Sequence, residues 1–143
     1  MFKRLLVACL LLSVVTAFAS PLSVDKAFVF STKLNHQSLK LDWKIQPGYR
    51  LYRDSIAIKT LKGSQIKLKD FQLPPGLKKE DEVRGVYHAF EHELVITLPL
   101  KKQKGNLLLS VSYQGCKIKG YCYAPVMKQV KTFINQHKII VSS

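Results

Sequence analysis

Apolar and polar residues alternate one by one along most of the chain. Leu39, Leu41 and Trp43, for example, are separated by Lys40 and Asp42. Because successive side chains of a strand point to opposite faces, a period of two gives one apolar and one solvated face. The pattern predicts half-buried strands in residues 39–45, 66–69, 94–100, 107–113 and 126–130.

Short groups of turn-forming residues separate these segments. The groups are Asn35-His36, Pro47-Gly48, Lys62-Gly63, Pro74-Pro75-Gly76 and Gly105-Asn106. No segment shows a sustained helical period. Many short strands at close spacing are typical of two antiparallel sheets packed face to face. The sequence therefore predicts an all-β fold, an antiparallel β-sandwich.

Residues 77–90 interrupt the alternation. They contain a run from Lys78 to Arg84 that is polar except for Val83, and Gly85 follows this run. We interpret the segment as an exposed loop between strands. Functional residues are often found on loops that a rigid scaffold holds in place, so this loop is a candidate part of a site.

The N-terminus has the features of a secretory signal peptide. Lys3 and Arg4 precede an apolar run from Leu5 to Phe18, and Ala17-Phe18-Ala19 provides the small residues of a cleavage site. We expect residues 1–19 to be removed after export, which leaves one domain over residues 20–143. A retained anchor helix is disfavoured because the run is shorter than the ~18 residues of a membrane span.

A lipoprotein anchor is the other alternative for the leader. Leu6-Val7-Ala8-Cys9 resembles a lipoprotein cleavage box. The apolar region that would precede Cys9 is too short for such a signal, so lipidation is the lesser alternative.

The chain is strongly basic, because 23 Lys and Arg against 9 Asp and Glu give a net charge of +14. Such an excess attracts acidic partners, anionic lipids or nucleic acid over long range. The lysines are spread along the chain, however, and mostly alternate with apolar residues, as on the solvated face of a sheet. No nucleic-acid-binding motif accompanies them, and we expect no nucleic-acid partner.

Cys116 and Cys122 are the cysteines that remain once the leader is removed. Two cysteines in an exported chain normally form a disulfide. They flank the turn-forming residues 117–120 and would lie on the two arms of a hairpin. Their disulfide closes a small loop and gains little from chain entropy, which grows with loop length. From these residues alone, a redox role and a structural staple are equally open.

The neighbours of the two cysteines favour thiol chemistry. Gly115 and Gly120 leave room beside the sulfurs for a partner's backbone. Lys117 and Lys119 would stabilise a thiolate, which is the attacking species. Flat apolar walls are expected from Tyr113, Tyr121 and Tyr123. Ordinary strand packing is the alternative explanation for these tyrosines.

Three segments resemble the N-terminal periplasmic domain of the thiol:disulfide interchange protein DsbD. Residues 48–54 (GYRLYRD) resemble the aromatic segment beside its active site, and residues 81–85 (DEVRG) resemble its cap loop. Residues 113–116 (YQGC) and 120–125 (GYCYAP) resemble its redox hairpin. The resemblance extends from about residue 27 to residue 132.

This resemblance implies an immunoglobulin-like sandwich with the redox hairpin and the cap loop at one end. It implies a protein-disulfide reductase component that takes electrons from a thioredoxin-like donor, which is itself supplied with electrons through a membrane domain. The acceptors would be oxidised periplasmic thioredoxin-fold proteins, such as disulfide isomerases and cytochrome c maturation factors. Cys122 would form the mixed disulfide and Cys116 would resolve it, by two thiolate attacks that need no metal or cofactor. We expect a monomer.

The resemblance also assigns the residues around the cysteines. The cap loop would consist of Asp81, Glu82, Val83, Arg84 and Gly85. The surroundings of the active site would be Tyr49, Tyr52, Tyr113, Gly115, Gly120, Tyr121 and Tyr123. The carboxylates of the cap loop would disfavour a thiolate if the loop folds over the pair.

Two departures from the family pattern affect these expectations. The centre of the family's cap loop is a shielding aromatic residue, whereas this chain has Val83. A smaller shield should leave the disulfide more accessible unless Tyr87 or Phe90 replaces it. The family domain also continues into a membrane segment and a thioredoxin-like domain. The sequence ends at Ser143 with neither, so we expect a stand-alone domain that meets its donor in trans, or a truncated product.

Other functions have weaker support. A basic immunoglobulin-like binding or chaperone module, with a purely structural disulfide, is the main alternative. A metal site is a third hypothesis, because His88 and His92 would share one face of a strand near the two thiols. Thiolates and imidazoles suit Cu(I) or Zn, but the cysteine spacing is unlike that of zinc motifs. No hydrolase motif is present.

Overall fold

The computed structural model describes residues 20–35, 37–100 and 103–135. The predicted signal peptide, the lipoprotein box with Cys9, and His36 of the first predicted turn lie outside the described residues. Among the residues described, no helix is long and apolar enough to cross a membrane.

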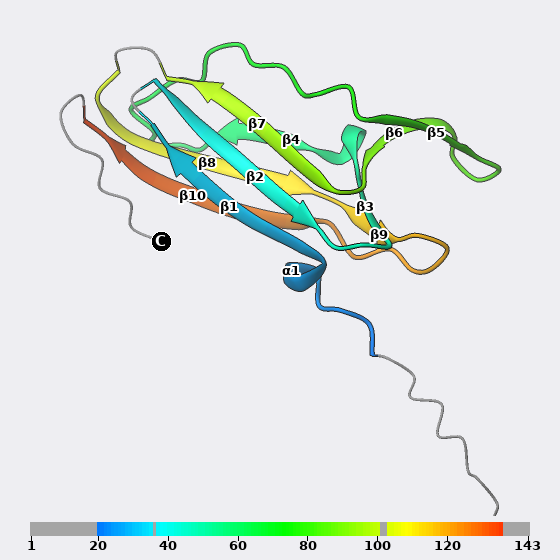
Figure 1. Ribbon diagram of the computed structural model, residues 1–143. Helices are drawn as coiled ribbons and strands as arrows, with labels where there is room; N and C mark the ends of the chain where they lie inside the picture. Colours follow the sequence, from blue (N-terminus) through cyan, green and yellow to red (C-terminus); the bar gives the residue numbers. More distant parts are fainter. Residues whose placement is uncertain (1–19, 36, 101–102, 136–143) are drawn as a thin grey trace, which may run out of the picture.

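The body of the protein is a sandwich of two three-stranded antiparallel sheets (Figure 1). The first sheet has the order β1-β2-β7, with strands Phe28–Leu34, Ser38–Ile45 and Glu93–Pro99. The second has the order β10-β8-β4, with strands Val126–Ile134, Gly105–Tyr113 and Ala57–Thr60. The predicted all-β antiparallel sandwich is confirmed.

A smaller antiparallel sheet forms one end of the sandwich (Figure 1). Its order is β5-β6-β3-β9, with strands Leu77–Asp81, Gly85–Phe90, Tyr49–Tyr52 and Gly115–Lys117. Only one residue, Gln114, separates β8 of the body from β9 of this end sheet, and the short 3-10 helix η1 (Arg53–Ser55) joins β3 to β4. A single helical turn, α1 (Val24–Ala27), precedes β1. The end sheet is therefore a direct extension of strands from the body.

The alternation seen in the sequence produces the core between the two sheets. Along β2 the side chains of Leu39, Leu41 and Trp43 are buried, whereas Lys40 and Lys44 are exposed. The same pattern occurs in β7 and β8. Each fully buried aliphatic or aromatic side chain contributes about 1.5–3 kcal/mol to stability. The apolar faces of the two sheets therefore hold the sandwich together.

The predicted strand at residues 66–69 is wrong. Ile66 is buried as the alternation suggested, but the segment forms no strand. The side-chain amide of Gln103 takes the place of a partner strand. Its Oε1 accepts from the backbone N–H of Lys67 and its Nε2 donates to the carbonyl of Lys67, both at 3.1 Å. Lys67 thus finds partners for both of its backbone groups, and Ile66 is buried, without a strand ladder.

The predicted loop at residues 77–90 is also wrong, because β5 and β6 pair there as a hairpin. The Asp81 carboxylate holds its turn by accepting the backbone N–H groups of Val83 (3.0 Å) and Arg84 (2.6 Å). The N–H of Arg84 is also the main cause that lowers the pKa of Asp81. Gly85 follows at φ 67°, in the left-handed region that glycine adopts without strain. We call residues 77–90 the cap hairpin.

Other boundaries also differ from the prediction. The alternation did not reveal β1, β3, β4 and β9, which are short or carry polar residues on both faces. The turn predicted at Gly105-Asn106 is instead the start of β8, where both residues pair with β10. The turns predicted at Pro47-Gly48 and Lys62-Gly63 are confirmed.

Candidate active site

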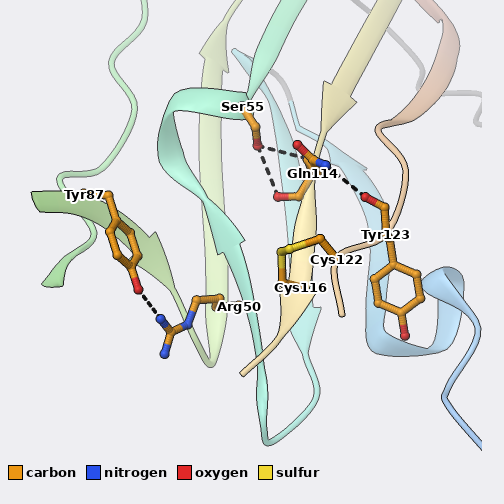
Figure 2. Close-up of a disulfide and its surroundings, with 7 residues drawn as sticks. All are labelled: Arg50, Ser55, Tyr87, Gln114, Cys116, Cys122 and Tyr123. Carbon is orange, nitrogen blue, oxygen red and sulfur yellow. Dashed lines mark hydrogen bonds between the residues drawn. A yellow bond between two sulfur atoms is a disulfide. The ribbon is translucent and has the colours of Figure 1, made fainter. Parts of the chain in front are cut away.

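Cys116 and Cys122 form a disulfide (Figure 2). Cys116 belongs to β9, which lies at the same end of the molecule as the cap hairpin (Figure 1). The two cysteines lie directly opposite each other in an isolated antiparallel bridge, with their Cα atoms 3.9 Å apart. Backbone hydrogen bonds lie on either side of this pair. The N–H of Lys117 donates to the carbonyl of Tyr121 (2.9 Å), and the N–H of Tyr123 donates to the carbonyl of Gly115 (3.0 Å). Such non-hydrogen-bonded pairs bring side chains closest together in an antiparallel ladder. We call residues 115–123 the redox hairpin.

The two sulfur-bearing residues differ in exposure. Cys116 is 3% exposed and packs with Tyr52, Tyr87 and Ala89. Cys122, on the other arm, is exposed. A molecule that approaches this disulfide from solvent therefore meets Cys122 first.

A groove of about 510 Å³ opens over the disulfide, between the cap hairpin and the redox hairpin. Both cysteines line it. The remaining lining residues are Arg50, Tyr52, Lys79, Glu80, Asp81, Val83, Tyr87, Lys117, Ile118, Lys119 and Gly120. The groove therefore combines an accessible disulfide with charged walls of both signs.

Arg50 connects the cap hairpin to the strand beside Cys116. It lies opposite Cys116 in the register of β3 and β9, and its guanidinium donates a hydrogen bond to the Tyr87 hydroxyl (Figure 2). The same guanidinium and the Lys79 ammonium each lie 3.1 Å from one carboxylate oxygen of Glu91. Burial raises the pKa of Tyr87, and the charge of Arg50 opposes this shift. Tyr87 therefore remains a neutral hydrogen-bond acceptor at neutral pH.

The residue at the centre of the cap, Val83, does not cover the disulfide, because it is 95% exposed. Its neighbour Arg84 instead places its guanidinium 3.7 Å from the centre of the Tyr52 ring. Tyr52 meets Tyr87 edge to face at 5.6 Å, and Arg50 lies 5.8 Å from the centre of the Tyr87 ring. We call this series the arginine–tyrosine stack. It lies against Cys116 and holds the cap hairpin to β3.

The sequence suggested Tyr87 or Phe90 as replacements for the missing aromatic shield. Tyr87 does pack in the cluster that contains Cys116. Phe90 belongs to the main core of the sandwich instead. In the cap loop itself, Glu82 is exposed and does not line the groove, whereas Asp81 does.

Tyrosines also lie on the outer side of the redox hairpin. The rings of Tyr121 and Tyr123 meet edge to face at 5.2 Å, with their hydroxyls 3.2 Å apart. Tyr49 stacks on Tyr123 at 6.3 Å, and Phe28 contacts both Tyr49 and Tyr123. This cluster packs the second arm of the hairpin against the first strand of the body.

Tyr113 lies in the core and not at the site. It is 1% exposed and meets Trp43 edge to face at 5.6 Å. Burial raises its pKa to about 12. The expected wall beside the sulfurs is thus a core residue, because it continues the inward face of β8.

Gly115 does not provide space for a partner, as the sequence suggested. A Cβ at this position would overlap the Phe28 ring and lie 2.7 Å from the carbonyl oxygen of Arg50. The glycine is therefore needed for the close packing of β9 against β1 and β3. Gly120 is exposed, and a Cβ there would meet only the side chain of Lys117, at 3.1 Å from its Cβ.

Sequence reasoning missed a hydrogen-bonded joint at the base of the redox hairpin (Figure 2). The Ser55 hydroxyl accepts the backbone N–H of Gln114 (2.9 Å) and lies within hydrogen-bond distance of the carbonyls of Tyr52 (2.7 Å) and Gln114 (3.2 Å). The Gln114 side chain donates to the carbonyl of Tyr123 (3.0 Å). These contacts link η1, the first arm and the second arm of the hairpin. Only the position of Gln114, beside the cysteine motif, gave a signal in the sequence.

The histidines of the metal hypothesis do not share a strand face. His88 lies within β6, whereas His92 lies after the end of this strand, in the turn before β7. Over the described ranges, no group of three His, Cys, Asp or Glu side chains is placed to hold a metal ion.

The fold and the site together define a β-sandwich domain with a two-cysteine disulfide in a groove at one end. The sequence model of the family "Thiol:disulfide interchange protein DsbD, N-terminal" matches residues 18–134. The chain belongs to this family.

Individual relatives agree with the family match. The chain is 37% identical to the DsbD of Photorhabdus laumondii over 109 residues, 76% of this chain and 18% of that protein. It is also 37% identical to the DsbD of Escherichia coli K12 over 106 residues, 74% of this chain and 18% of that protein. The chain thus matches less than a fifth of these longer relatives.

Solved structures extend the likeness to the fold. The reduced N-terminal domain of Neisseria meningitidis DsbD aligns with a TM-score of 0.68 and 30% identity, over 80% of this chain and 90% of that one. The same domain in a complex with the PilB N-terminal domain aligns with a TM-score of 0.69 and 28% identity, over 82% of this chain and 91% of that one. The predicted immunoglobulin-like fold is confirmed.

Proposed function

We propose that this chain is a periplasmic thiol–disulfide exchange domain. It takes two electrons from a thioredoxin-like donor and passes them to oxidised thioredoxin-fold proteins, among them disulfide isomerases and cytochrome c maturation factors. The difference in exposure between Cys116 and Cys122 carries the proposal. An exchange pair needs one sulfur that a partner can reach and a second sulfur that resolves the mixed disulfide.

The chemistry follows from this difference. The exposed Cys122 thiolate attacks one sulfur of a partner's disulfide, and the partner's other sulfur leaves as a thiolate. Cys116 then attacks the Cys122 sulfur and releases the partner as a dithiol. The domain is left oxidised, with the disulfide seen in the structure. Both steps exchange sulfur for sulfur, and the protons lost by the domain's thiols are taken up by the partner's.

Two further observations support the proposal. The solved complex of the Neisseria domain with the PilB N-terminal domain concerns a relative of the same fold, and it is consistent with a protein partner at this domain. The leader-like residues 1–19 support export to the periplasm, where disulfides persist. The proposal includes the named classes of electron donor and electron acceptor.

Single-cysteine variants test the assigned roles. Cys116→Ser and Cys122→Ser would each be reacted with a thioredoxin that keeps only its exposed cysteine, activated as a mixed disulfide with thionitrobenzoate. We expect Cys116→Ser, which retains Cys122, to form the covalent heterodimer at least about ten-fold faster, because the thiolate must be accessible to attack. Equal rates, or a faster reaction through Cys116, would contradict the proposal. Circular dichroism of both variants controls for folding.

A further inference from the structure

Two lysines of the redox hairpin have no carboxylate partner among the described residues. Lys117 and Lys119 are exposed and line the groove over the disulfide. Within the described part of the chain, no ion pair involves either of them. The other two cations of the groove, Arg50 and Lys79, are both paired with Glu91. The positive charges nearest in sequence to Cys122 are therefore free to meet an incoming group.

The backbone at Lys119 is a second, independent observation. Its φ is 55°, and no other non-glycine residue in the described ranges has a positive φ. The turn that requires it is closed by a 3.0 Å hydrogen bond from the N–H of Gly120 to the carbonyl of Lys117. Glycine adopts this conformation without the penalty that a Cβ carries. Backbone strain that persists beside a reactive group is a reason to expect a function there, and lysine is the side chain at this position.

The acidic wall of the groove does not cancel these charges. The cap hairpin contributes Glu80 and Asp81, and Asp81 already accepts two backbone N–H groups. The groove lining has four basic and two acidic residues, and therefore a net charge of +2. If Glu91, which pairs with Arg50 and Lys79, is included, the net charge is still +1. On a chain of net charge +14, the mouth of the groove presents a positive field to a partner.

We propose that Lys117 and Lys119 select partners whose disulfide is flanked by acidic residues. This inference rests on the proposed exchange function. The two ammonium groups attract carboxylates beside the partner's sulfurs and also stabilise the negative charge that the leaving thiolate acquires. Electrostatic complementarity of this kind raises the rate of encounter more than the affinity, and salt screens it. The specificity thus lies in the hairpin that carries the cysteines and not in the cap.

Small disulfides of different charge test the inference directly. The reduced full chain would be reacted with dithiodipropionate (anionic), hydroxyethyl disulfide (neutral) and cystamine (cationic), and its oxidation followed by quenched alkylation and mass spectrometry. The double variant Lys117→Gln/Lys119→Gln is compared with Lys40→Gln/Lys59→Gln, which removes two exposed lysines from the sandwich. The readout is the ratio of the anionic to the neutral rate constant. This ratio cancels any common change in thiolate reactivity.

We expect the hairpin double variant to lower this ratio about five- to ten-fold at low ionic strength, since one charge a few ångströms away changes such a rate about three-fold. The sandwich double variant should leave the ratio nearly unchanged, and high salt should remove the difference. If all three probes react normally and the ratio is unchanged in the hairpin variant, the proposed selection by Lys117 and Lys119 is overturned, whereas the exchange function is not. No reaction of the unmodified chain with any probe would overturn the exchange function and this inference together.

Discussion

The sandwich body is built by different means from the redox end, the part of the molecule that consists of the cap and redox hairpins. In the body, alternating apolar residues of β2, β7 and β8 pack into one continuous core. At the redox end, the cap and redox hairpins have mostly exposed side chains and depend on individual polar and aromatic contacts. The body thus owes its stability to buried apolar area, whereas the end owes its shape to a few specific interactions. A site of this kind can change its chemistry without changes to the core.

The largest effect is expected in the body. Trp43 is fully buried, with Phe30 and Tyr113 against its ring. Trp43→Ala should lower the free energy of unfolding by about 3–5 kcal/mol, because it removes a large apolar side chain and leaves a cavity. Denaturant unfolding followed by circular dichroism measures this loss. The exchange rate of the fraction that remains folded should stay within two-fold of the original, and a parallel collapse of that rate would show that the two regions are not separable.

Gly115→Ala should have the next largest effect, at the junction of the two regions. The new Cβ would overlap Phe28 and the backbone of Arg50, so β9 must move. Overpacking of this kind costs about 1–3 kcal/mol. Gly120→Ala is the matched control, since the atom nearest to its Cβ would be the Lys117 Cβ at 3.1 Å, which is a tight contact but not an overlap. Equal stabilities of the two variants in urea would refute the role assigned to Gly115.

A smaller loss is expected from Ser55→Ala, which removes the joint below the redox hairpin. The part-buried backbone N–H of Gln114 would lose its acceptor, and a hydrogen bond of this kind contributes about 0.5–1.5 kcal/mol to stability. Hydrogen exchange at the Gln114 amide should accelerate, while amides in the centre of β2 and β7 should keep their protection. If hydrogen exchange accelerated uniformly throughout the protein, Ser55 would instead stabilise the whole sandwich and not the redox hairpin in particular.

The smallest effect is expected in the cap hairpin. Arg84→Gln removes a cation–π contact with Tyr52, worth about 0.5–1 kcal/mol at an exposed site. The cap should open more often, and reduction of the disulfide by dithiothreitol should become about two- to five-fold faster. Val83→Ala should leave this rate unchanged because Val83 is 95% exposed. If Val83→Ala accelerates the reduction more than Arg84→Gln does, then Val83, and not Arg84, shields the disulfide.

The same contrast explains what could be predicted from the sequence. In the body, burial of one strand face leaves a two-residue period, so residues 39–45, 94–100 and 107–113 were recognised. The cap hairpin forms from polar residues, a carboxylate that holds the turn and Gly85, and none of these produces an alternating pattern. The segment around Ile66 shows the opposite error, because a single buried side chain produced alternation without a strand.

The site shows a similar division. The cysteines and the cap segment could be located from their motifs. Tyr113 was assigned to the site although it continues the alternation of Leu109 and Val111, a signal that placed it in the core. The contacts of Arg50 with Tyr87 and of Ser55 with Gln114 join residues far apart in the chain. One sequence carries no signal for such pairs, because they depend on how the strands are brought together.

The most direct test of the proposed exchange function is the reduction potential of the Cys116–Cys122 pair, measured by equilibrating the chain with glutathione redox buffers. We expect a midpoint of roughly −200 to −270 mV, within the range of proteins that exchange disulfides. A midpoint below about −300 mV would identify a structural staple. It would contradict the exchange function and favour a basic binding module.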